Sequence, residues 1–296
     1  MTKIWKKGEI VLVINRDSRK SIAKARQLQL LAKQFHLRTV ACGGSDLDFV
    51  LRQELKQKQL KRLVIAGGDG SVRLATSLVA RLNPKVEVAI IPVGTSNYYA
   101  KTLGVRSIAG SFETASSGCA QPRYACEANG RIFLMVANIG VVSRMFHEIS
   151  DLDKKRFGKL AYVWGMLKMF VSFTPMKVSI LLPDGQTLVY ATTEAQVINQ
   201  SISERVRVHP EVDSKDPYFE IVTFGLKETK LSPFIGIIVF IFTFGKNQRY
   251  VRRIRTNEAT ISINRPEVVS LDGDSLDQTP VHIKIVDRPV SFVRAD

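Results

Sequence analysis

The sequence predicts a doubly wound α/β domain followed by an antiparallel β-sandwich domain. Up to about residue 120, short apolar runs alternate with segments whose apolar residues recur at helical spacing. That alternation is typical of a parallel sheet with crossover helices. From about residue 122, strand-like runs follow one another with turn residues between them, which is typical of a sandwich. We therefore expect a boundary near residue 122, with domains at 1–121 and 122–296.

In the first part, the apolar run at residues 10–14 suits a buried strand. Apolar residues then recur at helical spacing between residues 22 and 32. Further strands are expected at residues 37–42, 63–66 and 86–91. Further helices are expected at residues 46–58 and 72–82, and another follows the turn at residues 92–97 and continues through residue 103. In such sheets, ligands bind outside the carboxyl ends of the strands.

In the second part, Asn129-Gly130 separates two strand-like runs at residues 124–128 and 132–138, which predicts a two-residue β-hairpin. A helix is expected at residues 157–173. More strands are expected at residues 178–182, 188–191, 221–224, 259–263 and 281–286.

The composition is that of a globular protein with a strong positive balance. The 296 residues include 43 Lys plus Arg against 27 Asp plus Glu, a formal charge of +16, and 45% are hydrophobic. Disorder and fibrous repeats are therefore excluded. The charge favours a polyanionic partner: nucleotide phosphates, an anionic membrane or nucleic acid.

Three scattered cysteines, Cys42, Cys119 and Cys126, make neither a disulfide framework nor a four-ligand zinc site. We interpret them as reduced thiols of a cytosolic protein without a signal peptide. The apolar run at residues 231–245 is shorter than the roughly 20 residues of a membrane-spanning helix.

Two glycine-containing turns follow predicted strands. In Gly67-Gly68-Asp69-Gly70-Ser71, the glycines would let backbone N–H groups approach a phosphate, and the next helix would add its positive N-terminus. Asp69 could hold a phosphate-bridging Mg²⁺. The alternative is a plain strand–helix turn with Asp69 as a cap. The second turn, at residues 92–97, offers Thr95, Ser96 and Asn97 to the same ligand, or is a plain turn with Ser96 as N-cap.

Together these segments resemble the diacylglycerol kinase catalytic domain family of lipid kinases. The family's GGDGT, P-x-G-T-x-N-D-F-A and D-G-E signatures are matched by residues 67–71, 92–100 and 272–274, and residues 157–162 also resemble the family. The resemblance implies a phosphofructokinase-like nucleotide-binding domain, then a lipid-binding β-sandwich domain, with the extreme C-terminus packing back on the first. ATP and lipid would meet in the cleft between the domains.

The resemblance also implies roles for individual residues. Asp274 stands where the family has its catalytic Glu, the proposed general base for the lipid hydroxyl, and Asp69 is the second candidate catalytic residue. ATP would be bound by residues of three loops: Asn15 and Ser18; Gly67, Gly68, Asp69, Gly70 and Ser71; and Thr95 and Asn97. In some bacterial members, the segment matching residues 210–220 binds a structural Mg²⁺. Here Asp216 and the carbonyls of Asp213 and Tyr218 would bind it, although a solvated acidic loop is the open alternative.

Several positions depart from the family pattern. In the first nucleotide loop, Arg16 replaces the family's Pro and Arg19 a small residue, and Arg73-Leu74 replace an Asn-Glu pair. Tyr98 removes a carboxylate expected to help hold Mg²⁺. Asp274 is one methylene shorter than Glu, and a misplacement of about 1 Å can cost about 100-fold in rate. These departures indicate altered metal handling and leave a weak or inactive kinase open.

A lipid substrate requires membrane contact. The apolar run at residues 231–245 precedes a basic group, Arg249, Arg252, Arg253 and Arg255, and a second basic group lies at residues 154–159. Apolar insertion next to basic residues is the usual basis of interfacial binding. A core helix followed by a charged edge strand is the alternative.

We therefore expect a cytosolic lipid kinase, peripheral at the inner face of the membrane, that uses ATP and Mg²⁺ to phosphorylate a diacylglycerol-like lipid. Two alternatives stay open: an NAD kinase-like small-molecule kinase and a catalytically silent nucleotide- or lipid-binding homologue. A homodimer is also left open, and nucleic acid is not expected as a partner.

Overall fold

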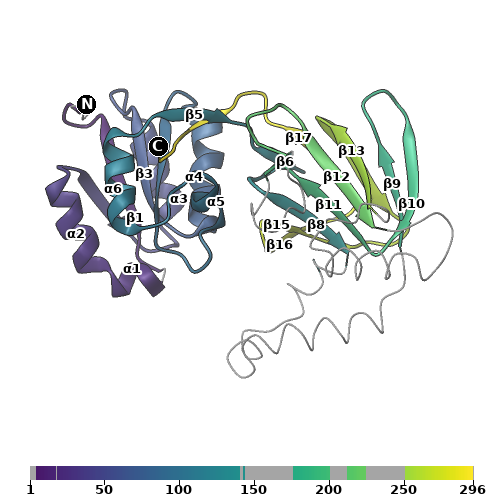
Figure 1. Cartoon of the computed structure of the whole chain (residues 1–296), viewed down its shortest axis with the longest axis horizontal. Helices are drawn as coiled ribbons and strands as arrows, with labels where there is room; N and C mark the ends of the chain where they lie inside the picture. Colours follow the sequence, from purple (N-terminus) through teal and green to yellow (C-terminus); the bar gives the residue numbers. More distant parts are fainter. Residues whose placement is uncertain are drawn as a thin grey trace, which may run out of the picture. The chain divides into compact units, whose positions relative to one another are not determined.

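The computed structural model describes residues 5–17, 19–140, 143, 176–200, 212–224 and 251–295. The chain forms two compact units, one of residues 1–125 and 286–296 and the other of residues 126–285 (Figure 1). The C-terminal residues thus belong to the first unit.

The first unit is built on a six-stranded sheet of order β2-β1-β3-β4-β18-β5. Strands β1 to β4 are mutually parallel, and β18 lies between β4 and β5, parallel to the former and antiparallel to the latter. The strands are β1 (Ile10–Asn15), β2 (Arg38–Cys42), β3 (Arg62–Gly67), β4 (Glu87–Pro92), β5 (Ala120–Arg123) and β18 (Val290–Val293).

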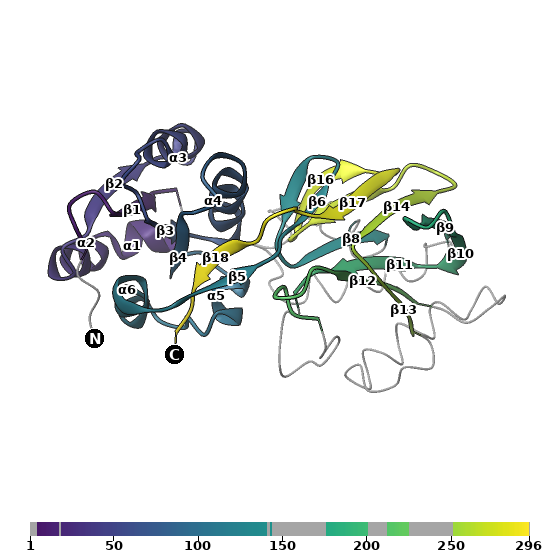
Figure 2. The ribbon, with the colours of Figure 1, turned by 90° about the horizontal axis from the view of Figure 1, so that it is seen from above.

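Helices cover both faces of this sheet. They are α1 (Arg19–Ala23), α2 (Ala25–Gln34), α3 (Leu47–Leu55), α4 (Asp69–Leu82), α5 (Tyr98–Thr102) and α6 (Ile108–Ser117). Figure 2 shows α3 and α4 on one face and α2 and α6 on the other. The central strands are therefore buried on both sides, which explains why β1 and β3 read as continuous apolar runs rather than alternating ones.

The described residues of the second unit form two six-stranded sheets, of order β10-β9-β14-β17-β6-β7 and β13-β12-β11-β8-β15-β16. The neighbouring strands described in these sheets are all antiparallel. The strands are β6 (Cys126–Ala128), β7 (Arg131–Phe133), β8 (Val136–Gly140), β9 (Met176–Leu181), β10 (Thr187–Thr192), β11 (Glu194–Ile198), β12 (Phe219–Phe224), β13 (Val251–Thr256), β14 (Glu258–Ile263), β15 (Val268–Leu271), β16 (Asp274–Gln278) and β17 (Val281–Ile285).

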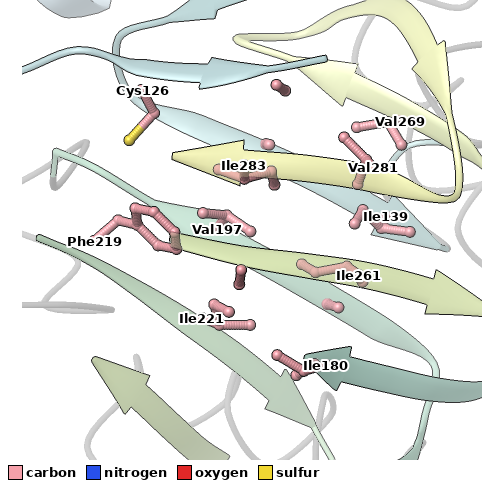
Figure 3. Close-up of a cluster of buried hydrophobic side chains, with 14 of the residues drawn as sticks. Cys126, Ile139, Ile180, Val197, Phe219, Ile221, Ile261, Val269, Val281 and Ile283 are labelled. Carbon is pink, nitrogen blue, oxygen red and sulfur yellow. The ribbon is translucent and has the colours of Figure 1, made fainter. Parts of the chain in front are cut away.

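The core of the second unit consists of side chains from both sheets. Alternate residues of most strands, such as Val197, Ile221 and Ile261, are fully buried in one apolar cluster (Figure 3). This period of two is the pattern of strands with one face in the core. The predicted fold class, an α/β domain followed by antiparallel β-sheets, is confirmed.

Some expected elements differ in detail. The helix expected from residue 22 is two helices, α1 and α2, which meet at Lys24. Helix α6 was not predicted; its local signal is Ser107, whose side chain accepts a hydrogen bond from the Gly110 N–H as an N-cap. The helix expected at residues 157–173 and the apolar run at 231–245 lie outside the described residues. Within the described part, no helix has the length and hydropathy needed to cross a membrane.

Candidate functional site

Three strand ends of the first unit converge at one edge of the sheet. Strands β1, β3 and β4 are parallel neighbours, with Ile14 opposite Ala66 and Gly67 opposite Pro92. The loops that follow Asn15, Gly67 and Pro92 are therefore adjacent, as the sequence predicted for a ligand site at the carboxyl ends of the strands.

Two of these loops touch through their glycines. A Cβ on Gly94 would lie 2.3 Å from the Gly68 Cα, and one on Gly67 would lie 2.5 Å from the Ser71 Cβ. The Val93 N–H also donates to the Gly67 carbonyl at 3.3 Å. These glycines are required for packing the loops together. The importance of Gly94 was not predicted, although the glycine within the second turn was a visible signal.

Gly70 serves a different purpose. It is exposed, and a Cβ there would meet nothing within 4 Å. It lies in the first turn of α4, whose N-cap, Gly68, has no side chain to bind the free N–H groups. Uncapped N–H groups at the start of a long helix attract anions. The loop can therefore accept a phosphate from the side of Gly70.

Asn15 connects the first loop to this helix. Its Nδ2 donates to the Ser71 Oγ at 3.0 Å, and its Oδ1 accepts from the Asp17 N–H at 3.0 Å. The Asp17 carboxylate in turn accepts from the Gly44 N–H at 2.6 Å, which ties in the loop after β2. Asp17 and Gly44 were not among the predicted site residues.

Asp69 is the first residue of α4 and is partly exposed. Its Oδ1 accepts from the Tyr99 N–H, 3.1 Å away, in the first turn of α5. It therefore caps α5 rather than its own helix. Its Oδ2 receives no hydrogen bond from a described residue, so one carboxylate oxygen can still bind a cation.

Asn97 supports the second loop through its side chain. Its Oδ1 accepts from the Gly94 N–H and its Nδ2 donates to the Gly94 carbonyl, both at 2.8 Å. Asn97 has a left-handed backbone, φ 49°, and it is the N-cap residue of α5, whereas the plain-turn alternative has Ser96 at that position. Thr95 is exposed at the loop tip, while Asn97 stabilises the loop internally.

Tyr98 occupies the position of the missing carboxylate. It is 46% exposed, and the Lys101 ammonium lies 5.1 Å from its ring centroid. Among the described residues, no group of three or more His, Cys, Asp or Glu side chains forms a metal site. In the first unit, Asp69 is therefore the predicted site residue that offers a carboxylate.

In the second unit, residues 272–274 form a tight hairpin between β15 and β16. Asp272 and Gly273 both have positive φ, 51° and 94°, as a two-residue type I′ turn requires. The Asp272 carboxylate accepts the N–H groups of Leu134, Met135 and Val136 at 2.8, 2.9 and 3.1 Å. Asp274, which opens β16, is exposed.

Asp272 is thus structural, which the sequence did not predict. Asp274, the candidate base, is accessible to a substrate. Burial raises the pKa of the nearby Cys126 thiol well above its ordinary value, and the Asp272 carboxylate raises it further. Cys126 is therefore an unreactive core thiol.

The candidate metal loop precedes β12. The Asp213 carbonyl accepts from the Asp216 N–H at 3.0 Å, and the Asp213 carboxylate lies 3.5 Å from the Lys215 ammonium. Burial raises the pKa of the Tyr218 phenol, while the charge of Arg255 lowers it and Asp216 raises it. The Arg255 guanidinium lies 4.4 Å from the Tyr218 ring centroid.

The basic group on β13 is divided between two faces of its sheet. Arg253 and Arg255 pair with the buried Glu220 carboxylate at 3.4 and 3.0 Å. Arg252 points to the opposite face because side chains alternate along a strand, and it stacks on Tyr190 at 4.7 Å. Ser18, Arg249 and the basic residues at 154–159 lie outside the described residues.

Residues 9–124 match the profile of the diacylglycerol kinase catalytic domain. A diacylglycerol kinase of Bacillus subtilis (strain 168) is 23% identical over 276 residues, covering 89% of this chain and 88% of the relative. A provisionally named lipid kinase of Streptococcus pneumoniae serotype 4 is 24% identical over 239 residues, covering 79% of each chain.

Solved structures show the same fold. A diacylglycerol kinase structure from Bacillus anthracis str. Sterne has a TM-score of 0.72 at 19% identity, covering 98% of each chain. Another from that strain, provisionally named a diacylglycerol kinase, has a TM-score of 0.79 at 22% identity, covering 99% of each chain. The resemblance inferred from the sequence is confirmed, and at the level of family it supports a kinase-type transferase.

Proposed function

We propose that the protein is an ATP-dependent lipid kinase that phosphorylates the hydroxyl of a diacylglycerol-like membrane lipid. The observation that carries the proposal is the contact between Gly68 and Gly94, which joins two strand-end loops beside the uncapped N-terminus of α4. This is a phosphate-binding arrangement, and it lies within the residues that match a kinase domain.

Phosphoryl transfer depends mainly on positioning and charge neutralisation. The backbone around Gly70 would hold the phosphates, and the second Asp69 oxygen fits a hard cation such as Mg²⁺. When bound, Mg²⁺ would neutralise charge on the phosphates. Asp274 would take the proton of the lipid hydroxyl. The hydroxyl oxygen would bond to the γ-phosphorus of ATP as the bond between that phosphorus and ADP breaks.

The test is transfer of labelled phosphate from ATP to vesicles containing diacylglycerol, phosphatidylglycerol, sphingosine or undecaprenol. We expect labelled lipid from the wild type and almost none from Asp69→Ala or Asp274→Ala. Asp48→Ala and Asp184→Ala are matched controls, because they remove exposed carboxylates of α3 and of a surface turn. Transfer that survives both site substitutions would contradict the proposal.

A silent nucleotide- or lipid-binding protein is the second candidate, because Leu74 and Tyr98 replace family carboxylates. ATP binding without transfer to any lipid would establish it. A parallel reaction with NAD as the acceptor tests the NAD kinase-like alternative.

We also propose that the first unit binds the nucleotide and the second the lipid, at the inner face of the membrane. The exposed Arg255 and the half-buried Arg253 are candidate contacts with anionic lipid headgroups. Asp216, with the Asp213 and Tyr218 carbonyls, is the candidate structural Mg²⁺ site.

A further inference from the structure

We propose that Asn15 is a positioning residue that directs the hydroxyl hydrogen of Ser71 toward a bound phosphate. This inference rests on the proposed nucleotide site and assigns Asn15 an indirect role there, through Ser71. It follows from the order of donors and acceptors in one short chain of hydrogen bonds.

The orientation of the Asn15 amide is fixed by its neighbour. A backbone N–H can only donate, so the Asn15 atom 3.0 Å from the Asp17 N–H is the carbonyl oxygen. The other terminal atom is therefore the amide nitrogen. This removes the usual ambiguity between the two ends of an asparagine side chain.

The amide nitrogen determines what Ser71 can do. An NH₂ group only donates, so the Ser71 Oγ, 3.0 Å away, must accept. The Ser71 hydrogen is then free to point elsewhere, and no described residue accepts it. Ser71 is 8% exposed, so little of the residue is open to bulk water.

A phosphate bound at the start of α4 would be an acceptor for the Ser71 hydrogen. Ser71 lies in the first turn of α4, next to the exposed Gly70, where an added Cβ would meet nothing within 4 Å. A phosphate held by the first-turn N–H groups would be an acceptor without any hydrogen of its own. The Asn15 contact therefore prepares Ser71 as a phosphate donor before the ligand arrives.

Asn15→Asp is the sharpest test, because it keeps the size and the acceptor for the Asp17 N–H. The second oxygen would then accept the Ser71 hydrogen and turn it away from the phosphate. We expect Kd for ATP, measured by calorimetry without lipid, to rise about 100-fold, since hydrogen bonds to charged groups are strong. Ser71→Ala should raise Kd by about 10-fold.

The double variant separates hydrogen orientation from the added charge. In the Ser71→Ala background, Asn15→Asp should raise Kd by a clearly smaller factor, because only the charge effect remains. Asn83→Asp, at the far end of α4, is the control for charge and should leave Kd unchanged. Thermal unfolding of each variant shows whether it is folded.

The outcomes are distinguishable from those of the proposed function. If the wild type does not bind ATP, the proposed nucleotide site itself fails. If it binds, and Asn15→Asp has the same effect with and without the Ser71 hydroxyl, the positioning role of Asn15 is wrong while the kinase proposal stands.

Discussion

The Asp-Gly motifs at residues 69–70 and 272–273 use their aspartates in opposite ways. In the loop of the first unit, one carboxylate oxygen of Asp69 accepts a hydrogen bond from the Tyr99 N–H, and the other accepts none from a described residue. In the hairpin of the second unit, both oxygens of Asp272 accept hydrogen bonds from three backbone N–H groups, and Asp274 is the proposed general base. The first site is built by close backbone approach, whereas the second is an exposed side chain on a rigid sandwich.

The largest expected effect concerns the backbone contact in the first unit. Gly94→Ala places a Cβ 2.3 Å from the Gly68 Cα, so the two loops must separate. We expect a loss of about 3 kcal/mol in unfolding free energy, together with loss of ATP binding. Chemical denaturation and calorimetry measure the two quantities.

Gly70→Ala is the matched control for stability, because its Cβ meets nothing within 4 Å. Alanine also suits a helix better than glycine, by up to about 1 kcal/mol. Equal destabilisation by both substitutions would show that the contact between Gly68 and Gly94 is not what holds the loops together.

The next prediction tests the division of labour in the hairpin. Asp272→Asn keeps a residue that tolerates positive φ but places an NH₂ group against backbone donors. We expect unfolding free energy to fall by about 2 to 4 kcal/mol. Asp274→Asn should change stability by less than about 0.5 kcal/mol, because Asp274 is exposed, while phosphate transfer is lost. If Asp274→Asn lowered stability and Asp272→Asn abolished transfer, Asp274 would be the structural residue and Asp272 the base.

The fold and the location of the first site could be predicted from the sequence because periodicity and strand-end glycines are local signals. Ion pairs and hydrogen bonds between residues far apart in the sequence could not be predicted in this way. In the sequence, Arg62 is one of 43 Lys and Arg residues with nothing to distinguish it, yet it is 1% exposed and paired with Glu87 at 2.6 Å. Likewise, nothing local distinguishes Asp272, which binds N–H groups more than 130 positions away, from Asp274.

A smaller effect is expected for membrane binding by the second unit. Glu220 partly neutralises Arg253 and Arg255, so Glu220→Gln should strengthen binding to anionic vesicles by about fivefold, the value of one charge near the surface. Co-sedimentation with phosphatidylglycerol vesicles measures this, and salt should weaken it. Glu258→Gln, on the other sheet, is the control. Unchanged or weaker binding by Glu220→Gln would count against this face as the membrane contact.

The smallest expected effect is the titration of Tyr218. Burial raises its pKa above the ordinary value near 10, so its contribution to stability is complete below about pH 10 and is lost as pH rises through the folded-state pKa. Because Asp216 also raises this pKa, Asp216→Asn should lower the midpoint of phenolate absorbance. A Mg²⁺ ion bound to Asp216 would neutralise the same carboxylate and lower the midpoint in the wild type but not in Asp216→Asn. A midpoint indifferent to Mg²⁺ in both would leave Asp216 as part of a solvated acidic loop that binds no Mg²⁺.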